Sequence, residues 1–110
     1  MRILIAILFM GVCTKALAAG ETGFRKVSLV GCHINEPVCF VQIDGPAVGP
    51  SACSGNSIRF DPTASATGQS VLSLIYAAHF SGKTLNFYMS DACFTRQAGF
   101  PTFYYVQVAS

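Results

Sequence analysis

Residues 53–93 read CSGNSIRFDPTASATGQSVLSLIYAAHFSGKTLNFYMSDAC, and this stretch decides the fold that we expect. It opens with a short apolar strand at residues 57–60, continues with one helical pattern, and closes with an apolar strand that begins near Thr84. Cysteines stand at both ends, so a bond between Cys53 and Cys93 would clamp the helix against the sheet. The stretch indicates an architecture and identifies no reaction.

The helix is predicted over about residues 67–81. Its apolar residues recur at i, i+3, i+4 and i+7, which is the spacing of a buried helical stripe. These residues are Val71, Leu74, Ile75 and Ala78. The hydroxyl of Thr67 or Ser65 is expected to cap the first-turn amides, and Gly82 to take the left-handed position that ends the helix.

Strands are predicted on both sides of the helix from β-branched and aromatic content. They cover residues 23–34, 38–43, 57–60, 84–89 and 103–108. A turn at residues 35–37 would join the first two as a hairpin. Residues 44–51 hold two glycines and two prolines and read as a loop, and residues 91–101 read as a long connection. The sequence thus predicts a single, mainly β domain, a small antiparallel barrel or sandwich with one helix closing an end.

The chain opens with the order of a secretory signal peptide. Met1 and Arg2 precede an apolar run at residues 3–12 and the small-residue sequence Ala-Leu-Ala at 16–18. The run is shorter than the roughly 20 residues that a membrane anchor needs, and Met10-Gly11-Val12 is a poor lipoprotein signal before Cys13. Cleavage is expected after Ala18. Residues 19–110 would then be an exported domain, periplasmic or secreted, without a membrane span.

Charge and cysteine content change when residues 1–18 are removed. Five basic and five acidic side chains remain, and this balance argues against binding to nucleic acid or anionic lipid. Four cysteines remain: Cys32, Cys39, Cys53 and Cys93. An even number in a short exported chain predicts disulfides, with three possible connectivities. A zinc site is the alternative, but zinc ligands usually come in closer pairs. Cys32 and Cys39 flank the hairpin turn and would face each other across it.

Candidate catalytic residues are few. His79 falls on the flank of the helix, where a satisfied structural hydrogen bond is expected, and His33 stands exposed beside a turn cysteine. No serine has a G-x-S-x-G signature. Asp44 and Asp61 precede turn residues, where carboxylates commonly cap backbone amides. We therefore expect no enzyme, no cofactor and no metal.

Aromatic residues are more numerous than a small core requires. Tyr104 and Tyr105 are adjacent in a predicted strand and should point to opposite faces, so at least one would face outward or into a subunit contact. Tyr76 and Phe80 lie off the buried helical stripe, either under a loop or exposed as contact residues. Apolar surface on a domain with no net charge favours a protein partner, most simply a second copy of the chain in a homo-oligomer.

The turn, helix and strand residues carry a family resemblance. Cys53 to the Asp61-Pro62 pair, the sequence TGQSVL at 67–72, Ser81-Gly82-Lys83, Cys93 and Gly99-Phe100-Pro101 are placed as in the receptor-binding B subunits of subtilase cytotoxin and pertussis-like AB toxins. The chain also resembles short, mostly uncharacterised exported bacterial proteins of the same build. The resemblance covers roughly residues 38–108.

The resemblance implies an OB-type barrel of about five strands with one helix. In the toxins it also implies a ring of five subunits that binds sialylated glycans. No position here matches the sugar-contacting serine of the toxin subunits, so no glycan residue is carried over. In relatives with fewer cysteines the remaining pair resembles Cys53 and Cys93, which leaves Cys32 to Cys39. The toxin subunits instead join the equivalents of Cys39 and Cys53.

These observations favour an exported, non-enzymatic binding module that resembles a toxin B subunit and recognises a glycan or protein receptor. The alternative is an orphan periplasmic protein with a structural or inhibitory role towards another protein, and a small hydrolase that uses His33 or His79 is a third hypothesis. The candidate binding surface lies outside residues 53–93, on the hairpin, the 44–51 loop and the last predicted strand. Its residues are His33, Asn35, Asp44, Tyr104 and Tyr105.

Overall fold

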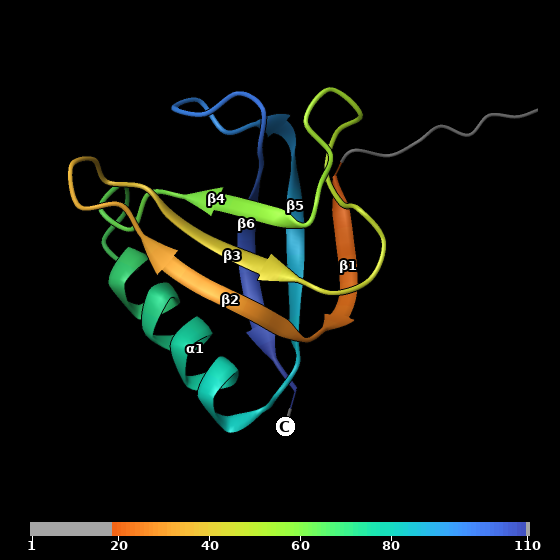
Figure 1. The fold of residues 1–110 in the computed structure, drawn as a ribbon, viewed down its shortest axis with the longest axis vertical. Helices are drawn as coiled ribbons and strands as arrows, with labels where there is room; N and C mark the ends of the chain where they lie inside the picture. Colours follow the sequence, from red (N-terminus) through yellow and green to blue (C-terminus); the bar gives the residue numbers. More distant parts are fainter. Residues whose placement is uncertain (1–18, 110) are drawn as a thin grey trace, which may run out of the picture.

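The computed structural model describes residues 19–109, and the predicted signal peptide at 1–18 lies outside the described residues. Six strands and one helix follow one another along the chain (Figure 1). They are β1 (Gly20–Arg25), β2 (Val27–Cys32), β3 (Cys39–Ile43), β4 (Ser57–Phe60), α1 (Gly68–Ser81), β5 (Leu85–Cys93) and β6 (Pro101–Val108). The fold is mainly β, as predicted. The helix has the predicted bounds to within one residue.

The strands form two antiparallel sheets of three strands each, in the orders β1-β5-β6 and β2-β3-β4. The single strand expected over residues 23–34 is in fact divided at Lys26, and its halves belong to different sheets. The corner is fixed by Asp44, whose Oδ1 accepts a hydrogen bond from the Lys26 amide at 2.9 Å. Arg25 adds a bond to the Asp44 carbonyl at 2.7 Å. Residues 19–109 therefore form six strands instead of about five.

The two sheets do not close into a complete barrel. Strand β4 packs against β6, but among residues 19–109 no ladder of hydrogen bonds joins these two strands. The architecture is a pair of small facing sheets with one helix beside them, and the OB-type barrel stays a prediction.

The core lies between the sheets and under the helix. Its largest fully buried side chains come from every layer and include Phe87, Ile58, Ile75, Leu85 and Met89. The helix lies against β2 and β6, with Ile75 and Ala78 buried and Val71 and Leu72 packed on the core. The predicted apolar stripe is confirmed at Val71, Ile75 and Ala78, because this spacing places one face of the helix on the sheets. Its fourth predicted member, Leu74, is only half-buried.

The two ends of the helix differ from each other in how well they were predicted. Gly82 ends it in the left-handed conformation, with φ of 74°, as expected. Thr67 is the N-cap residue, but its side chain makes no capping hydrogen bond. With φ of −100° and ψ of 3° its backbone is outside the β region that a capping side chain needs, and its hydroxyl lies 3.5 Å from that of Ser65. The predicted side-chain cap is wrong.

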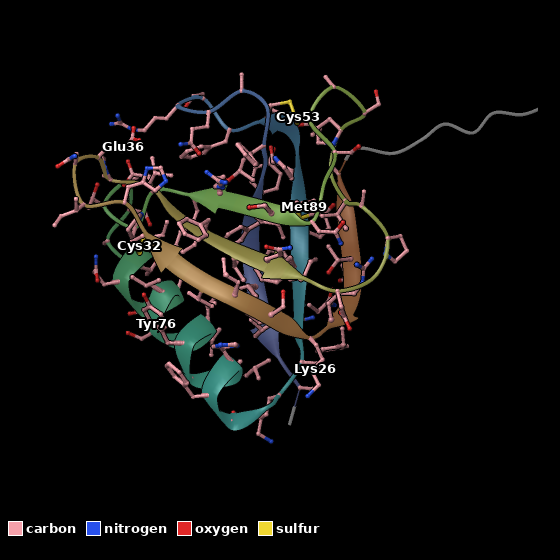
Figure 2. All side chains as sticks on the ribbon, in the orientation of Figure 1. Lys26, Cys32, Glu36, Cys53, Tyr76 and Met89 are labelled. Carbon is pink, nitrogen blue, oxygen red and sulfur yellow. A yellow bond between two sulfur atoms is a disulfide. The ribbon has the colours of Figure 1, made fainter. Side chains whose placement is uncertain are left out.

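Both disulfides have the pairing predicted with the family resemblance. One joins Cys32 to Cys39, which are opposite each other across β2 and β3; Figure 2 shows Cys32 at the end of β2, beside the turn that carries Glu36. The other joins Cys53 to Cys93, with Cα atoms 6.0 Å apart. This second bond joins the loop before β4 to the end of β5, so it fixes that loop, and not the helix, to the sheet. The helix is held by the packing of its own buried residues on the core. Two disulfides are typical of a protein that folds in an oxidising compartment.

Candidate functional site

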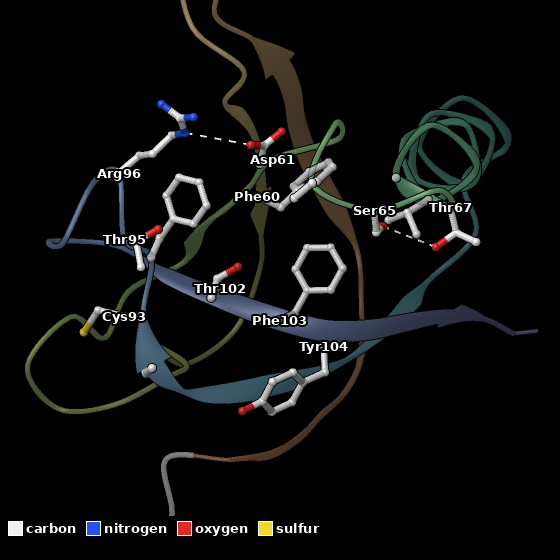
Figure 3. A pocket seen from close by; sticks show the side chains of 15 residues that line it. Phe60, Asp61, Ser65, Thr67, Cys93, Thr95, Arg96, Thr102, Phe103 and Tyr104 are labelled. Carbon is white, nitrogen blue, oxygen red and sulfur yellow. Dashed lines mark hydrogen bonds and ion pairs between the residues drawn. The ribbon is translucent and has the colours of Figure 1, made fainter.

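A pocket of about 440 Å³ lies between the segment before α1, residues 92–96 and strand β6 (Figure 3). Its apolar lining includes Phe60 and Phe103, whose rings meet edge to face with centroids 5.3 Å apart. Its polar lining includes four residues with hydroxyl groups and two charged residues: Ser65, Thr67, Thr95, Thr102, Asp61 and Arg96. The pocket therefore offers a small apolar floor with hydrogen-bonding groups around it.

One ion pair borders this pocket. Arg96 Nε lies 3.8 Å from Asp61 Oδ2. A hydrogen bond from the Thr63 side chain is the main reason that the pKa of Asp61 is lower than usual, and the Thr63 amide and Arg96 add to the effect. Asp61 thus caps the local backbone, as its position before a turn predicted. The side chains that line the pocket include no histidine, so the pocket can hold a polar group but has no imidazole base beside its hydroxyls.

Two of the candidate binding residues lie on the β2-β3 hairpin turn. His33 Nδ1 is 2.9 Å from Glu36 Oε2, and its ring meets that of Phe40 edge to face at 5.9 Å. Asn35 is exposed at the tip. Because the Cys32–Cys39 bond closes the base of this turn, the hairpin is a fixed projection with both residues accessible.

Asp44 has a structural role at the corner between β1 and β2, where its carboxylate binds the Lys26 amide. The position is exposed, but it belongs to the loop that follows β3 at the opposite end from the hairpin turn (Figure 1). The structure does not bring Asp44 together with His33 and Asn35.

Tyr104 and Tyr105 come together with a third tyrosine, Tyr88. The Tyr88 ring stacks on that of Tyr105 at 5.1 Å and lies 6.2 Å from that of Tyr104. Tyr88 pairs with Tyr105 in the ladder and Met89 pairs with Phe103, so Tyr104 has no residue opposite it. This bulge turns both tyrosines to the outer face of the sheet, and Figure 3 shows the Tyr104 ring on the other side of β6 from Phe103. The prediction that Tyr104 and Tyr105 point to opposite faces is wrong.

We call Tyr88, Tyr104 and Tyr105 the tyrosine face. Tyr104 is 63% exposed and Tyr105 46% exposed. Polar residues border them: Glu21 is opposite Tyr88 in the ladder, and the Tyr104 hydroxyl donates to Asp91 Oδ1 at 3.2 Å. Tyr88 was missed in the sequence, although the alternation of buried Leu85, Phe87 and Met89 places it outward.

A buried amide lies beside the tyrosine face. Asn86 is 4% exposed, and its Nδ2 donates to Glu21 Oε1 at 3.0 Å. Its Oδ1 has no hydrogen-bond partner within residues 19–109. Successive side chains of a strand point to opposite faces, and Asn86 stands between the core residues Leu85 and Phe87. Its side chain is therefore on the same outer side of β5 as that of Tyr88. An unpaired buried acceptor costs about 1–3 kcal/mol.

His79 has the structural role predicted for it, because its Nδ1 lies 3.1 Å from the Val27 carbonyl oxygen and so links α1 to β2. Within residues 19–109, no three His, Cys, Asp or Glu side chains cluster closely enough to hold a metal ion. The described part of the chain also has no helix with the length and apolar character to cross a membrane.

Comparisons with known proteins add no relative: no family model, no curated protein and no solved structure matches the chain.

Proposed function

We propose that this protein is an exported, non-enzymatic binding module whose tyrosine face binds a glycan. The observation that carries the proposal is the gathering of three tyrosine rings on one outer sheet face by the β5-β6 bulge. Two of these rings are substantially exposed.

The chemistry of this face suits a sugar. A pyranose ring has a flat face of C–H groups, which packs on an aromatic ring, and a rim of hydroxyls, which needs donors and acceptors. The tyrosine rings supply flat apolar area with a hydroxyl at the end of each ring, and Glu21 and Asp91 place carboxylate acceptors beside them. Tyrosine also loses little conformational entropy when it makes a contact.

The similarity to toxin B subunits, with its OB-type barrel and its periplasmic or secreted location, is part of the same proposal. In that setting a homo-oligomer, a pentamer by resemblance, would present several tyrosine faces at once. Phe80 on α1 is 81% exposed and stacks on Tyr76 with ring centroids 6.3 Å apart. This pair is the apolar contact that we propose for the oligomer.

A glycan array tests the proposal. Wild-type protein should bind a limited set of glycans, and Tyr105→Ala should lose that signal because the Tyr88 ring loses its stacking partner. Tyr76→Phe is the matched control: it removes only the hydroxyl of a tyrosine outside the tyrosine face and keeps the ring that stacks on Phe80, so it should bind as wild type does. A blank array for a folded protein that is also monomeric by size-exclusion chromatography would contradict the proposal. Stoichiometric capture of one protein would favour the structural or inhibitory alternative.

A further inference from the structure

Arg59 stands on the outer face of the other sheet. Its neighbours Ile58 and Phe60 in β4 are buried in the core, so the alternation of the strand directs Arg59 outward. The guanidinium carbon lies 3.6 Å from the centroid of the Phe100 ring and 5.2 Å from that of Phe40. Two aromatic rings from two different segments therefore flank one cation.

Hydrogen bonds and packing fix this arrangement. Arg59 Nε donates to Ser57 Oγ at 3.2 Å, and Nη1 donates to Gln97 Oε1. Phe40, which is opposite Arg59 in the ladder, lies across Gly31 of β2 so closely that a Cβ there would be 2.6 Å from the ring. A larger residue at position 31 would force the Phe40 ring to move, and the two hydrogen bonds restrict how the guanidinium can turn.

The charge of Arg59 is left without an anion. An arginine has five N–H donors, and two bonds to Ser57 and Gln97 leave three free within residues 19–109. Within residues 19–109 no carboxylate forms a salt bridge with Arg59: Asp61 is paired with Arg96, and the Glu36 carboxylate lies 2.9 Å from His33 Nδ1. Burial lowers the pKa of Arg59, which means that the cation is partly desolvated and would gain from an anionic partner.

We propose that Arg59, flanked by Phe40 and Phe100, binds the carboxylate group of a ligand. A carboxylate is planar and carries one charge, which matches a single guanidinium with free, coplanar donors. A phosphate dianion would call for further cations or backbone amides, and the neighbouring arginine, Arg96, is already paired with Asp61. The aromatic rings exclude water from one side of the guanidinium, which strengthens the charge-assisted hydrogen bonds. The site is on the sheet opposite the tyrosine face. Carboxylate binding at Arg59 is therefore independent of glycan binding at the tyrosine face, and either proposal can fail without the other.

The test is an NMR titration of the ¹⁵N-labelled protein with sodium acetate, which presents the bare carboxylate, against sodium chloride at equal ionic strength. We expect saturable shifts at Phe40, Arg59 Nε and Phe100, with a Kd on the order of 1–10 mM. Glucuronate and N-acetylaspartate amide, used in separate arms, distinguish an acidic sugar from an acidic side chain as the source. Shifts that never saturate or equal those in chloride, or tighter binding of inorganic phosphate, would overturn the proposal.

Two variants separate binding from a structural role of Arg59 in anchoring residues 94–100. Gln97→Glu places a carboxylate beside the guanidinium with almost no change of shape, so it should keep or raise the thermal midpoint while weakening acetate binding at least about tenfold. Arg96→Gln removes a neighbouring arginine that is already paired, and should bind acetate within about twofold of wild type. If Gln97→Glu bound acetate as well as wild type does, Arg59 would be only an anchor.

Discussion

Removing the Cys53–Cys93 bond by a double substitution to alanine should lower the free energy of unfolding by about 4 kcal/mol. The two cysteines are 40 residues apart. In the chain-entropy model, a cross-link that closes such a loop removes about 13 cal/mol/K from the unfolded state, which is about 4 kcal/mol at 25 °C. The same relation gives about 2.4 kcal/mol for Cys32–Cys39, whose separation is 7 residues. The difference between the two bonds is therefore about 1.5 kcal/mol.

Urea unfolding followed by circular dichroism measures both losses. Cys53 is 3% exposed and Cys39 is 2% exposed, so each double substitution truncates one well-buried cysteine, and the cavity costs should largely cancel in the comparison. A domain of this size has a total stability of about 5–15 kcal/mol, so the larger loss is a considerable part of it. The reasoning is refuted if the Cys32→Ala, Cys39→Ala protein is destabilised as much as the Cys53→Ala, Cys93→Ala protein, or more.

Three further predictions concern single side chains. Gly68→Ala would place a Cβ 2.0 Å from the Pro62 carbonyl oxygen and should cost about 1–3 kcal/mol in urea unfolding; an unchanged midpoint would show that the helix start shifts freely. The pKa of Asp61 is lowered in the folded protein, mainly by Thr63. Asp61 therefore adds to the free energy of unfolding above its unfolded-state pKa of about 3.9, and this stabilisation is lost as the pH falls through the lower folded-state pKa. The free energy of unfolding of Asp61→Asn should therefore fall less steeply at acid pH than that of wild type, and equal slopes for the two proteins would argue against this. Phe80→Ser, at an exposed position, should lower the molar mass measured by light scattering with less than about 0.5 kcal/mol change in stability; an unaltered mass would exclude Phe80 from the oligomer contact.

The helix and most strands were predictable because their signals are local. An apolar stripe with helical spacing lies within 14 residues of sequence, and the structure buries its Ile75 and Ala78. The division of the first strand at Lys26 was not predictable, because residues on both sides have strand character and the change of sheet depends on contacts with Asp44. The uncapped start of α1 likewise depends on the Thr67 backbone angles, which the identity of the residue does not determine.

The candidate site was predicted in part. Tyr104 and Tyr105 belong to one surface, but their common orientation comes from a shift of register between β5 and β6, and register is a property of the paired strands. Arg59 was missed, although its place between Ile58 and Phe60 marks it as outward-facing. Its partners Phe40 and Phe100 are far from each other in sequence, so only the fold shows that they flank the same guanidinium.

Intrinsic fluorescence tests the proposed function of the tyrosine face most directly. The chain has no tryptophan and four tyrosines, of which three form the tyrosine face and the fourth, Tyr76, is on the helix. Titration with sialyllactose and with the glycans bound on the array should give a saturable change in tyrosine emission. The change should persist in Tyr76→Phe and disappear in Tyr105→Ala. A saturable change that is lost in Tyr76→Phe and kept in Tyr105→Ala, or no change with any glycan, would contradict a binding site on the tyrosine face.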